Sequence, residues 1–520
     1  MNTHRPSEPG AARTGLGASF AAALLLAACG GGDGAAPTEQ ASSVSPPSCD
    51  NRVNNTFSKL LDCVTPEGVR EHQAALQAIA DANGGTRAAG TPGYELSVQY
   101  VVDKMTAAGY DVTLNAFPFV YIAPATLQQT APLAAPYQTG AFTGSGSGNI
   151  AANVSAVDIN LVPPRASTSG CEAADFAGFP VGNIALIQRG TCTFAQKAQN
   201  AQAAGASAVI IFNQGNTPAR EELIVGTLAP FSAAIPVVGA SFADGAALAQ
   251  PGSSASLVVA PPQNITQVNV IAESRDGDPN NVVVVGAHLD SVSDGPGIND
   301  NGSGSAAILE TALQMAKVKP RNKLRFAWWG AEEAGLVGST AYVAGLSDEA
   351  KAKIALYLNF DMVGSPNHVF FVYDGDDSDA TGAGPGPVGS AQIEQVFERF
   401  YTQRGLPFKG TDFSGRSDYG PFIANGIPAG GLFTGAEGIK TADEAALWGG
   451  TAGQQYDPCY HLACDAYANV NLTALDVNAD AVAYATLQFA MNTVAVNGKR
   501  GKGNFKVPAD VGDKYRHLRE

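Results

Sequence analysis

Positive charge is scarce in this chain. Its 520 residues include 31 Lys and Arg against 47 Asp and Glu, and the formal net charge at pH 7 is −16. Because nucleic acids are bound chiefly through Lys and Arg contacts to phosphate, we expect no nucleic-acid partner. Long apolar runs are also missing, since the one notable run, inside residues 1–28, is too short for a membrane-spanning helix.

Two common catalytic signatures are absent as well. The chain contains neither a G-x-S-x-G nucleophile elbow nor a G-x-x-x-x-G-K-[ST] phosphate loop. One G-x-G-x-x-G match occurs at Gly384, Gly386 and Gly389, but prolines interrupt it and no strand runs directly into it. We therefore interpret that segment as a loop.

What the chain does contain is a set of short motifs rich in His, Asp and Glu. GAHLDSV with GINDNGSG, WWGAEEAG, NFDMVG and PCYHLACD supply five candidate metal ligands, which are His288, Asp300, Glu333, Asp361 and His461. Two imidazoles and three carboxylates can hold two zinc ions roughly 3.5 to 4 Å apart, provided that one carboxylate bridges them. Only six histidines are present, and two of them fall in these motifs.

The strand pattern around the motifs predicts that they meet. Residues 282–290, 323–330 and 355–362 are short apolar runs separated by helical stretches, which is typical of buried parallel strands in an alternating βα chain. The candidate ligands of these runs lie at or just beyond the strands' C-terminal ends, where open α/β sheets place their ligand sites. The alternative, that these acidic residues are ordinary helix caps, does not explain the two histidines.

Residues from about 264 to 495 resemble the secreted bacterial leucine aminopeptidases, which are exopeptidases with two zinc ions. The resemblance rests on H-x-D, the turn G-x-N-D-N-G-S-G, the E-E pair, N-F-D-M and C-Y-H. It implies that His288 and Asp361 bind one zinc, that Glu333 and His461 bind the other, and that Asp300 bridges both. It also implies a cis peptide after Asp300.

The same resemblance assigns roles to five neighbouring residues. Asp290 stands behind His288 as its carboxylate partner, and Glu332 is the general base that takes a proton from the zinc-bridging water, the nucleophile. Tyr460 donates a hydrogen bond to the oxyanion, although it could be a core or rim tyrosine. Arg416 lines the substrate site or makes a surface ion pair, and Phe433 is a wall of the substrate pocket or a core residue.

The seven cysteines suit an exported protein. The resemblance pairs Cys459 with Cys464 around His461. Proximity along the chain suggests two further pairs, Cys171 with Cys192 and Cys49 with Cys63, although sequence alone does not fix connectivity. Cys29 is left over.

Cys29 belongs to an N-terminal export signal. Two arginines, an apolar stretch and the sequence LAAC resemble a bacterial lipoprotein signal, so that residues 1–28 are removed and Cys29 is lipidated. A plain signal peptide cut after Ala28 is the alternative. The mature chain has a formal charge of −17, because residues 1–28 contain two Arg and one Glu. Residues 29–62, which begin with a tract rich in Gly, Ser and Pro, are expected to be a flexible tether.

The chain then divides into two folded units. We expect a catalytic domain in two parts, residues 63–130 and 264–497, interrupted by an insertion over residues 131–263 and followed by a basic tail at 498–520. The insertion resembles a protease-associated domain, with a strand, a helix and a strand in NIALIQRG, TFAQKAQNAQAA and ASAVIIFN. It lacks catalytic groups of its own, so we interpret it as a lid or a structural spacer.

These observations predict an α/β fold with a mixed, mainly parallel central sheet flanked by helices, and with a smaller inserted α/β domain. The expected function is a zinc-dependent aminopeptidase that removes apolar residues such as Leu, Phe or Met from a free peptide N-terminus. It would be an exported monomer, either secreted or anchored to the cell envelope by a lipid. The first alternative is a carboxypeptidase or dipeptidase with the same two-zinc core, and the second is a non-catalytic binding module. Asp476 and Asp480 resemble a calcium site, but a helical turn starting near Thr473 also explains their spacing.

Overall fold

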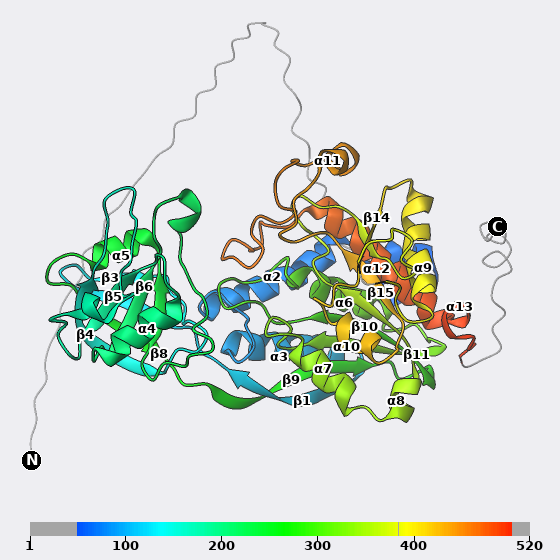
Figure 1. The fold of residues 1–520 in the computed structure, drawn as a ribbon. Helices are drawn as coiled ribbons and strands as arrows, with labels where there is room; N and C mark the ends of the chain where they lie inside the picture. Colours follow the sequence, from blue (N-terminus) through cyan, green and yellow to red (C-terminus); the bar gives the residue numbers. More distant parts are fainter. Residues whose placement is uncertain (1–48, 383, 502–520) are drawn as a thin grey trace, which may run out of the picture. The chain divides into compact units, whose positions relative to one another are not determined.

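The computed structural model describes residues 49–382 and 384–501. Its larger part is built on an eight-stranded sheet in the order β1-β9-β11-β10-β12-β15-β13-β14 (Figure 1). The strand bounds, in sheet order, are β1 Asp111–Tyr121, β9 Gln263–Glu273, β11 Asn322–Trp329, β10 Asp278–His288, β12 Ile354–Phe360, β15 Ala429–Phe433, β13 Phe371–Tyr373 and β14 Lys409–Thr411.

The centre of this sheet is parallel. β10 lies between β11 and β12 and is parallel to both, and β12 is parallel to β15. All seven residues of β12 are buried, as expected for a strand covered on both faces. Antiparallel pairs occur between β1 and β9, β9 and β11, and β13 and β15. The predicted mixed sheet with a parallel core is thus confirmed.

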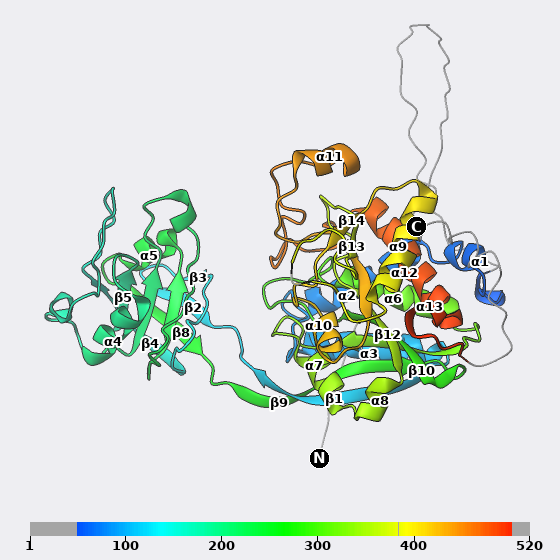
Figure 2. The ribbon, with the colours of Figure 1, turned by 45° about the vertical axis from the view of Figure 1, so that its right-hand side comes forward.

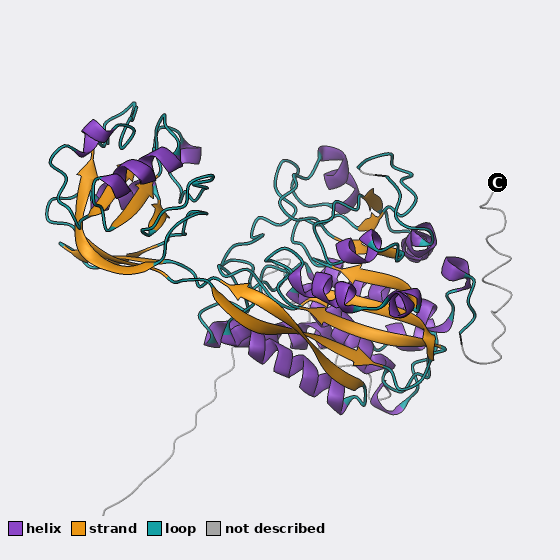
Figure 3. Cartoon of the chain, turned by 60° about the horizontal axis from the view of Figure 1, so that its bottom comes forward, coloured by secondary structure: helices purple, strands orange, loops and turns teal. Residues whose placement is uncertain are grey.

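Helices cover both faces of the sheet (Figure 3). One core contains Val283, Val285 and Phe360 from the strands together with buried residues of five helices: α2 Pro66–Ala82, α3 Pro92–Ala107, α6 Gly302–Met315, α9 Ser390–Arg404 and α12 Leu472–Met491. Val282 and Val284 point to the other face, against α7 Val337–Gly345 and α10 Tyr419–Ala424. The alternation along β10 therefore makes a three-layer α/β fold. The short helices α8 Asp348–Ala352, α11 Ala442–Trp448 and α13 Val494–Asn497 complete this part.

A second sheet, of seven strands, forms the inserted domain. Its order is β3-β2-β8-β4-β5-β6-β7, with bounds β2 Thr126–Ala131, β3 Ala135–Tyr137, β4 Gly148–Val157, β5 Ile184–Gln188, β6 Ala208–Phe212, β7 Val237–Ala240 and β8 Ser254–Val259. The expected strand, helix and strand are β5, α4 (Phe194–Ala203) and β6, and α5 (Phe242–Leu248) follows β7. Since β2 begins at Thr126, the inserted sheet starts slightly earlier than the expected boundary at residue 131.

Two long antiparallel strands carry the chain into and out of the insertion. β1 ends where β9 begins, and their register pairs Tyr121 with Gln263 and Asp111 with Glu273. Figures 1 and 2 show the two strands side by side along their length. The insertion therefore interrupts the catalytic sheet at a single point between two paired strands.

The prediction of a flexible tether over residues 29–62 is wrong for its last part. A 3₁₀ turn spans Cys49–Asn51, helix α1 spans Phe57–Leu61, and the Cys49–Cys63 disulfide joins the two ends of this segment. Leu60 is fully buried, and the Phe57 ring lies 4.4 Å from that of Tyr484 on α12. Here the composition changes from Gly, Ser and Pro to residues that can pack, which is why the segment folds.

The expected signal peptide over residues 1–28, the lipidation site Cys29 and most of the basic tail at 498–520 lie outside the described residues. Within the described ranges, no helix is long and apolar enough to cross a membrane.

Candidate metal centre

The ends of three neighbouring parallel strands bring the predicted ligands together. His288 is the last residue of β10, Asp361 directly follows β12, and Glu332 and Glu333 come just beyond β11. Asp300 lies immediately before the N-cap Asn301 of α6. Because parallel strands place their C-terminal ends on one edge of the sheet, these side chains converge there.

Two groups of three side chains that share Asp300 form at this edge, beside a third group of His288, Glu332 and Glu333. In the first group, His288 Nε2 lies 3.1 Å from Asp300 Oδ1 and 3.3 Å from Asp361 Oδ1. In the second, His461 Nε2 lies 3.2 Å from Asp300 Oδ2 and 3.0 Å from Glu333 Oε2. Each group could hold a metal ion. The two oxygens of Asp300 thus face different histidines, as a bridging carboxylate requires.

These spacings fit zinc. Ligand atoms about 2 Å from a tetrahedral zinc lie roughly 3.3 Å from one another. The four distances above fall close to that value. In addition, Glu333 Oε1 is buried and has no hydrogen-bond partner within the described protein. A buried carboxylate oxygen without a donor costs free energy, and a cation would satisfy it.

The tautomer of His288 supports the same conclusion. Its Nδ1 lies 3.1 Å from the backbone carbonyl of Asp290, and only an Nδ1–H can make that hydrogen bond. In the neutral ring, Nε2 then carries a lone pair that faces the oxygens of Asp300 and Asp361. This arrangement is repulsive unless a cation, or a second ring proton, lies between them.

The pKa values of the metal-free site reflect crowded carboxylates. Burial raises the pKa of Glu333 to about 7, helped by the charge of Asp300 and opposed by His461. Burial also raises the pKa of Glu332 well above its usual range. For His461, burial alone would lower the pKa, but the hydrogen bonds to Asp300 and Glu333 raise it to about 10. The site therefore retains protons that a metal ion would have to displace.

The backbone at the site is unusual where side chains must turn inward. Ala331, Met362 and His461 all have positive φ, at 55°, 53° and 58°, and each is a site residue or adjoins one. The Asp300–Asn301 peptide is cis, which confirms the expectation for the residue after the bridging carboxylate.

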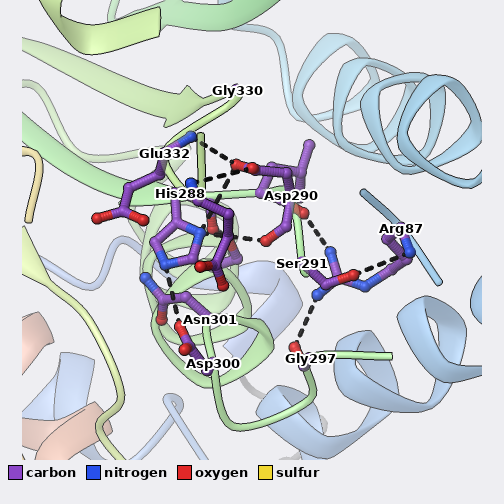
Figure 4. Close-up of polar contacts among 12 residues, drawn as sticks. Arg87, His288, Asp290, Ser291, Gly297, Asp300, Asn301, Gly330 and Glu332 are labelled. Carbon is purple, nitrogen blue, oxygen red and sulfur yellow. Dashed lines mark hydrogen bonds and ion pairs between the residues drawn. The ribbon is translucent and has the colours of Figure 1, made fainter. Parts of the chain in front are cut away.

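Asp290 lies beside His288, as expected, and makes further contacts that were not expected. Its carboxylate lies 3.7 Å from His288 Nδ1, whereas its backbone carbonyl takes the hydrogen bond from that ring. The carboxylate instead accepts the backbone N–H of Glu332 at 3.1 Å and of Glu333 at 3.3 Å (Figure 4). Asp290 thus ties the segment after β11 to the end of β10.

A cavity opens onto the candidate metal ligands, and Arg416, Phe433 and Tyr460 are among the residues that line it. The Tyr460 ring stacks on His461 with centroids 3.8 Å apart, and its hydroxyl accepts a hydrogen bond from Arg416 Nη2 at 3.2 Å. Arg416 also forms an ion pair with Glu437 at 2.7 Å. Arg416 thus lines the cavity and makes an ion pair, and Phe433 lines the cavity while its ring lies 5.9 Å from that of Phe371, so their roles toward a substrate stay predictions.

Sequence reasoning missed several supporting residues. Ser417 Oγ donates to Asp361 Oδ2 at 2.6 Å and accepts from Asn359 at 2.9 Å, so it orients a predicted ligand. Its position directly after Arg416 is the only signal in the sequence. Arg87 and Asp465 are fully or almost fully buried beside the site, and no motif marks Arg87.

The structure contains the three expected disulfides, Cys49–Cys63, Cys171–Cys192 and Cys459–Cys464. Asp476 and Asp480 lie on α12, which begins at Leu472 after the N-cap Asn471 and thus slightly earlier than expected. Arg404 donates to Asp480 at 3.0 Å, and this positive charge disfavours a calcium ion at the pair.

Comparisons with known proteins agree with this geometry. Residues 269–486 match Peptidase family M28, and residues 157–248 match the PA domain. The chain is 51% identical over 445 residues to an aminopeptidase of Pseudomonas aeruginosa, covering 84% of this chain and 83% of that protein. It is 42% identical to a probable lipoprotein aminopeptidase of Mycobacterium tuberculosis, covering 88% of this chain and 89% of the relative.

Solved structures show the same fold. A zinc aminopeptidase from Bacillus subtilis superposes with a TM-score of 0.57 at 26% identity, covering 81% of this chain and 94% of that one. With the family match, the relatives and the ligand geometry in agreement, the chain belongs to peptidase family M28 and is a zinc-dependent aminopeptidase of that family with an inserted PA domain.

Proposed function

We propose that the protein binds two zinc ions and removes apolar residues from the free N-terminus of peptides. The observation that carries the proposal is the position of Asp300, whose two oxygens face His288 and His461 separately. His288 and Asp361 would hold one ion, and Glu333 and His461 the other. Zinc at such a site lowers the pKa of a water to about 7 and polarises a carbonyl.

Glu332 is the proposed general base. It is 8% exposed and lines the cavity, yet it belongs to neither group of three that contains Asp300. Burial raises its pKa, so it can accept a proton from the attacking water and later pass it to the leaving amine. The backbone N–H groups of Glu332 and Glu333 donate to Asp290, and these contacts hold the Glu332 side chain in place.

Tyr460 is the proposed donor to the oxyanion. Its hydroxyl lies at the cavity and accepts from Arg416, so its own proton remains available to a substrate carbonyl. Burial and the neighbouring carboxylates raise the pKa of Tyr460, which keeps the hydroxyl protonated. Such a donor is typically worth roughly 3 to 4 kcal/mol in the transition state.

The cavity also supports the direction of substrate entry. A peptide N-terminus is cationic, and Glu332, Glu333 and Asp361 form an acidic end that would bind it. Arg416 is the one Arg or Lys of the lining, and it is already paired with Glu437, which leaves it less suited to bind a C-terminal carboxylate. Met362 and Phe433 provide an apolar wall for the first side chain.

Substitution of the base tests the mechanism. Glu332→Gln should keep two zinc ions per chain and lose nearly all turnover of Leu-p-nitroanilide. Glu310→Gln is a matched control, because Glu310 is a buried glutamate that pairs with His72. Near-normal turnover of the Glu332 variant would refute the assignment.

The peptide end and the side-chain preference have separate tests. Cleavage of N-acetylated peptides in place of free ones would favour the carboxypeptidase or dipeptidase alternative. We expect Leu, Phe and Met p-nitroanilides to be cleaved faster than those of Asp or Glu. Metal analysis after exchange into cobalt or manganese shows which ions the site accepts.

We also propose that the protein is an exported monomer, secreted or anchored through a lipid on Cys29. Three disulfides suit an oxidising compartment, and the Mycobacterium tuberculosis relative is named a probable lipoprotein. Loss of palmitate labelling in a Cys29→Ala variant, with release from the membrane fraction, would support the anchor. We do not extend the proposal to calcium at Asp476 and Asp480, because Arg404 neutralises Asp480.

A further inference from the structure

The loop between β10 and α6 determines the geometry of the metal centre. It begins after His288 and ends at Asp300, so its shape fixes the distance between two proposed ligands. The loop has no regular secondary structure, and every one of its residues from Pro296 to Asp300 is buried. Its buried backbone groups must therefore find hydrogen-bond partners within the protein.

Arg87 supplies partners for three carbonyls of this loop. It lies between α2 and α3 in the sequence, and its side chain is fully buried. Each of its three guanidinium nitrogens donates to a different carbonyl. Nε donates to Pro296 at 2.9 Å, Nη2 to Gly297 at 2.7 Å and Nη1 to Leu289. The side chain thus joins the start of the loop to its end (Figure 4).

Asp465 supplies the partners for the amides. Its Oδ1 accepts from Asn299 N at 2.8 Å and its Oδ2 from Asp300 N at 2.9 Å, while its backbone carbonyl accepts from Ile298 N at 3.0 Å. Asp465 is 2% exposed and directly follows Cys464, whose disulfide closes the loop that carries His461. It therefore connects the loop of one proposed ligand with that of another.

The two residues are complementary. A buried guanidinium donates to the carbonyls of residues 296–297 and a buried carboxyl group accepts from the amides of residues 299–300, so side-chain hydrogen bonds fix the segment before Asp300. The segment is also tightly packed. A Cβ added at Gly297 would lie 2.3 Å from the carbonyl oxygen of Asp300 and 3.3 Å from Arg87 Nη2.

We propose that Arg87 and Asp465 are positioning residues that together hold residues 289–300, so that Asp300 keeps one oxygen toward each histidine. Neither residue lines the cavity, and the hydrogen bonds described above go to backbone groups. The proposal rests on the assignment of Asp300 as the bridging ligand. It gives both residues a role in the reaction beyond stabilising the fold.

Conservative variants test the proposal. Arg87→Lys keeps the charge but cannot reach three separated carbonyls, because Lys has a single nitrogen. Asp465→Asn keeps the shape but points an NH₂ group at one backbone amide. We expect each variant to bind zinc roughly 10- to 100-fold more weakly than the parent, measured on metal-free protein against a chelator. At saturating zinc, kcat for Leu-p-nitroanilide should fall while KM changes less than about twofold, because substrate binding is not altered.

Arg325→Met is the matched control. Arg325 is a largely buried arginine of the same sheet that pairs with Glu273 and Tyr342, away from the ligands. Its loss should lower the unfolding temperature and leave zinc affinity unchanged. The double variant Arg87→Lys, Asp465→Asn should lose less affinity than the product of the two single losses, because both act on one loop.

Three results would overturn the proposal. The first is parental zinc affinity and kcat in both single variants, even with lower unfolding temperatures, because that pattern describes a purely structural role. The second is equal weakening of zinc binding in Arg325→Met. The third is a loss of zinc affinity in the double variant that equals the product of the two single losses. A parent protein that binds fewer than two zinc ions would refute the proposed function instead, which is a distinct outcome.

Discussion

Removal of the Cys459–Cys464 disulfide should affect activity far more than removal of Cys171–Cys192, although it should affect global stability less. The first bond joins residues 5 apart and the second joins residues 21 apart. In the chain-entropy description, these separations correspond to about 2 kcal/mol and about 3.3 kcal/mol of stabilisation at 25 °C. The order of the two stability losses therefore follows from loop length alone.

The order of the activity losses follows from what each loop contains. The short loop carries Tyr460 and His461, and Asp465 follows it directly. Without the bond, the loop must be ordered when metal binds. If this ordering cost equals the roughly 2 kcal/mol of loop entropy, zinc affinity falls about 30-fold. The Cys171–Cys192 loop belongs to the inserted domain and contains none of the proposed ligands.

Two double variants test this reasoning. In one, Cys459 and Cys464 are both replaced by Ser, and in the other, Cys171 and Cys192 are both replaced by Ser. We would measure thermal unfolding in EDTA, zinc affinity by chelator competition, and hydrolysis of Leu-p-nitroanilide. The Cys459 and Cys464 variant should recover turnover as zinc is added, because its defect is in metal binding. Equal activity losses in both variants would refute the reasoning, and so would parental zinc affinity after loss of the short loop's bond.

Three further predictions concern single groups. Tyr460→Phe should lower kcat about 100-fold or more with a small change in KM, measured by steady-state kinetics, because it removes the oxyanion donor; an unchanged kcat would contradict this role. In metal-free protein, hydrogen bonds to carboxylates outweigh burial and raise the pKa of His461 from 6.5 to about 10. Its contribution to stability is thus complete below about pH 6.5 and is lost as the pH rises through 10, and urea unfolding in EDTA should show this decline. A flat profile would contradict it. Gly304→Ala should destabilise the protein by roughly 1 to 3 kcal/mol in the same urea assay, since a Cβ there would lie 2.1 Å from the Phe360 carbonyl oxygen; a loss below about 0.5 kcal/mol would contradict this estimate.

The central strands could be predicted because their pattern has one explanation. The run from Val282 to Val285 is apolar and β-branched throughout, which favours a strand buried on both faces. The candidate ligands could be predicted for a related reason, since His288 and Asp361 occur where parallel strands end. In these places the local pattern and the overall fold require the same structure.

Other elements gave no comparable signal. β13 and β14 contain only three residues each, too few to show a period. Arg87 follows a glycine-rich turn, where an arginine is ordinarily exposed, and its burial depends on carbonyls about 200 residues later in the chain. The helix at Phe57–Leu61 was missed because its burial comes from α12 rather than from its own short sequence.

The pairing of Tyr121 with Gln263 has a consequence for how such proteins diversify. The two residues at which the PA domain departs and returns are direct partners in one ladder, so a tight turn of two residues could join them and restore a continuous hairpin. The entropic cost of closing a loop rises only slowly with its length, so a connection of a different length at this point changes that cost little. The inserted domain can therefore be gained, exchanged or lost at this point during evolution while the eight-stranded sheet keeps its backbone hydrogen bonds.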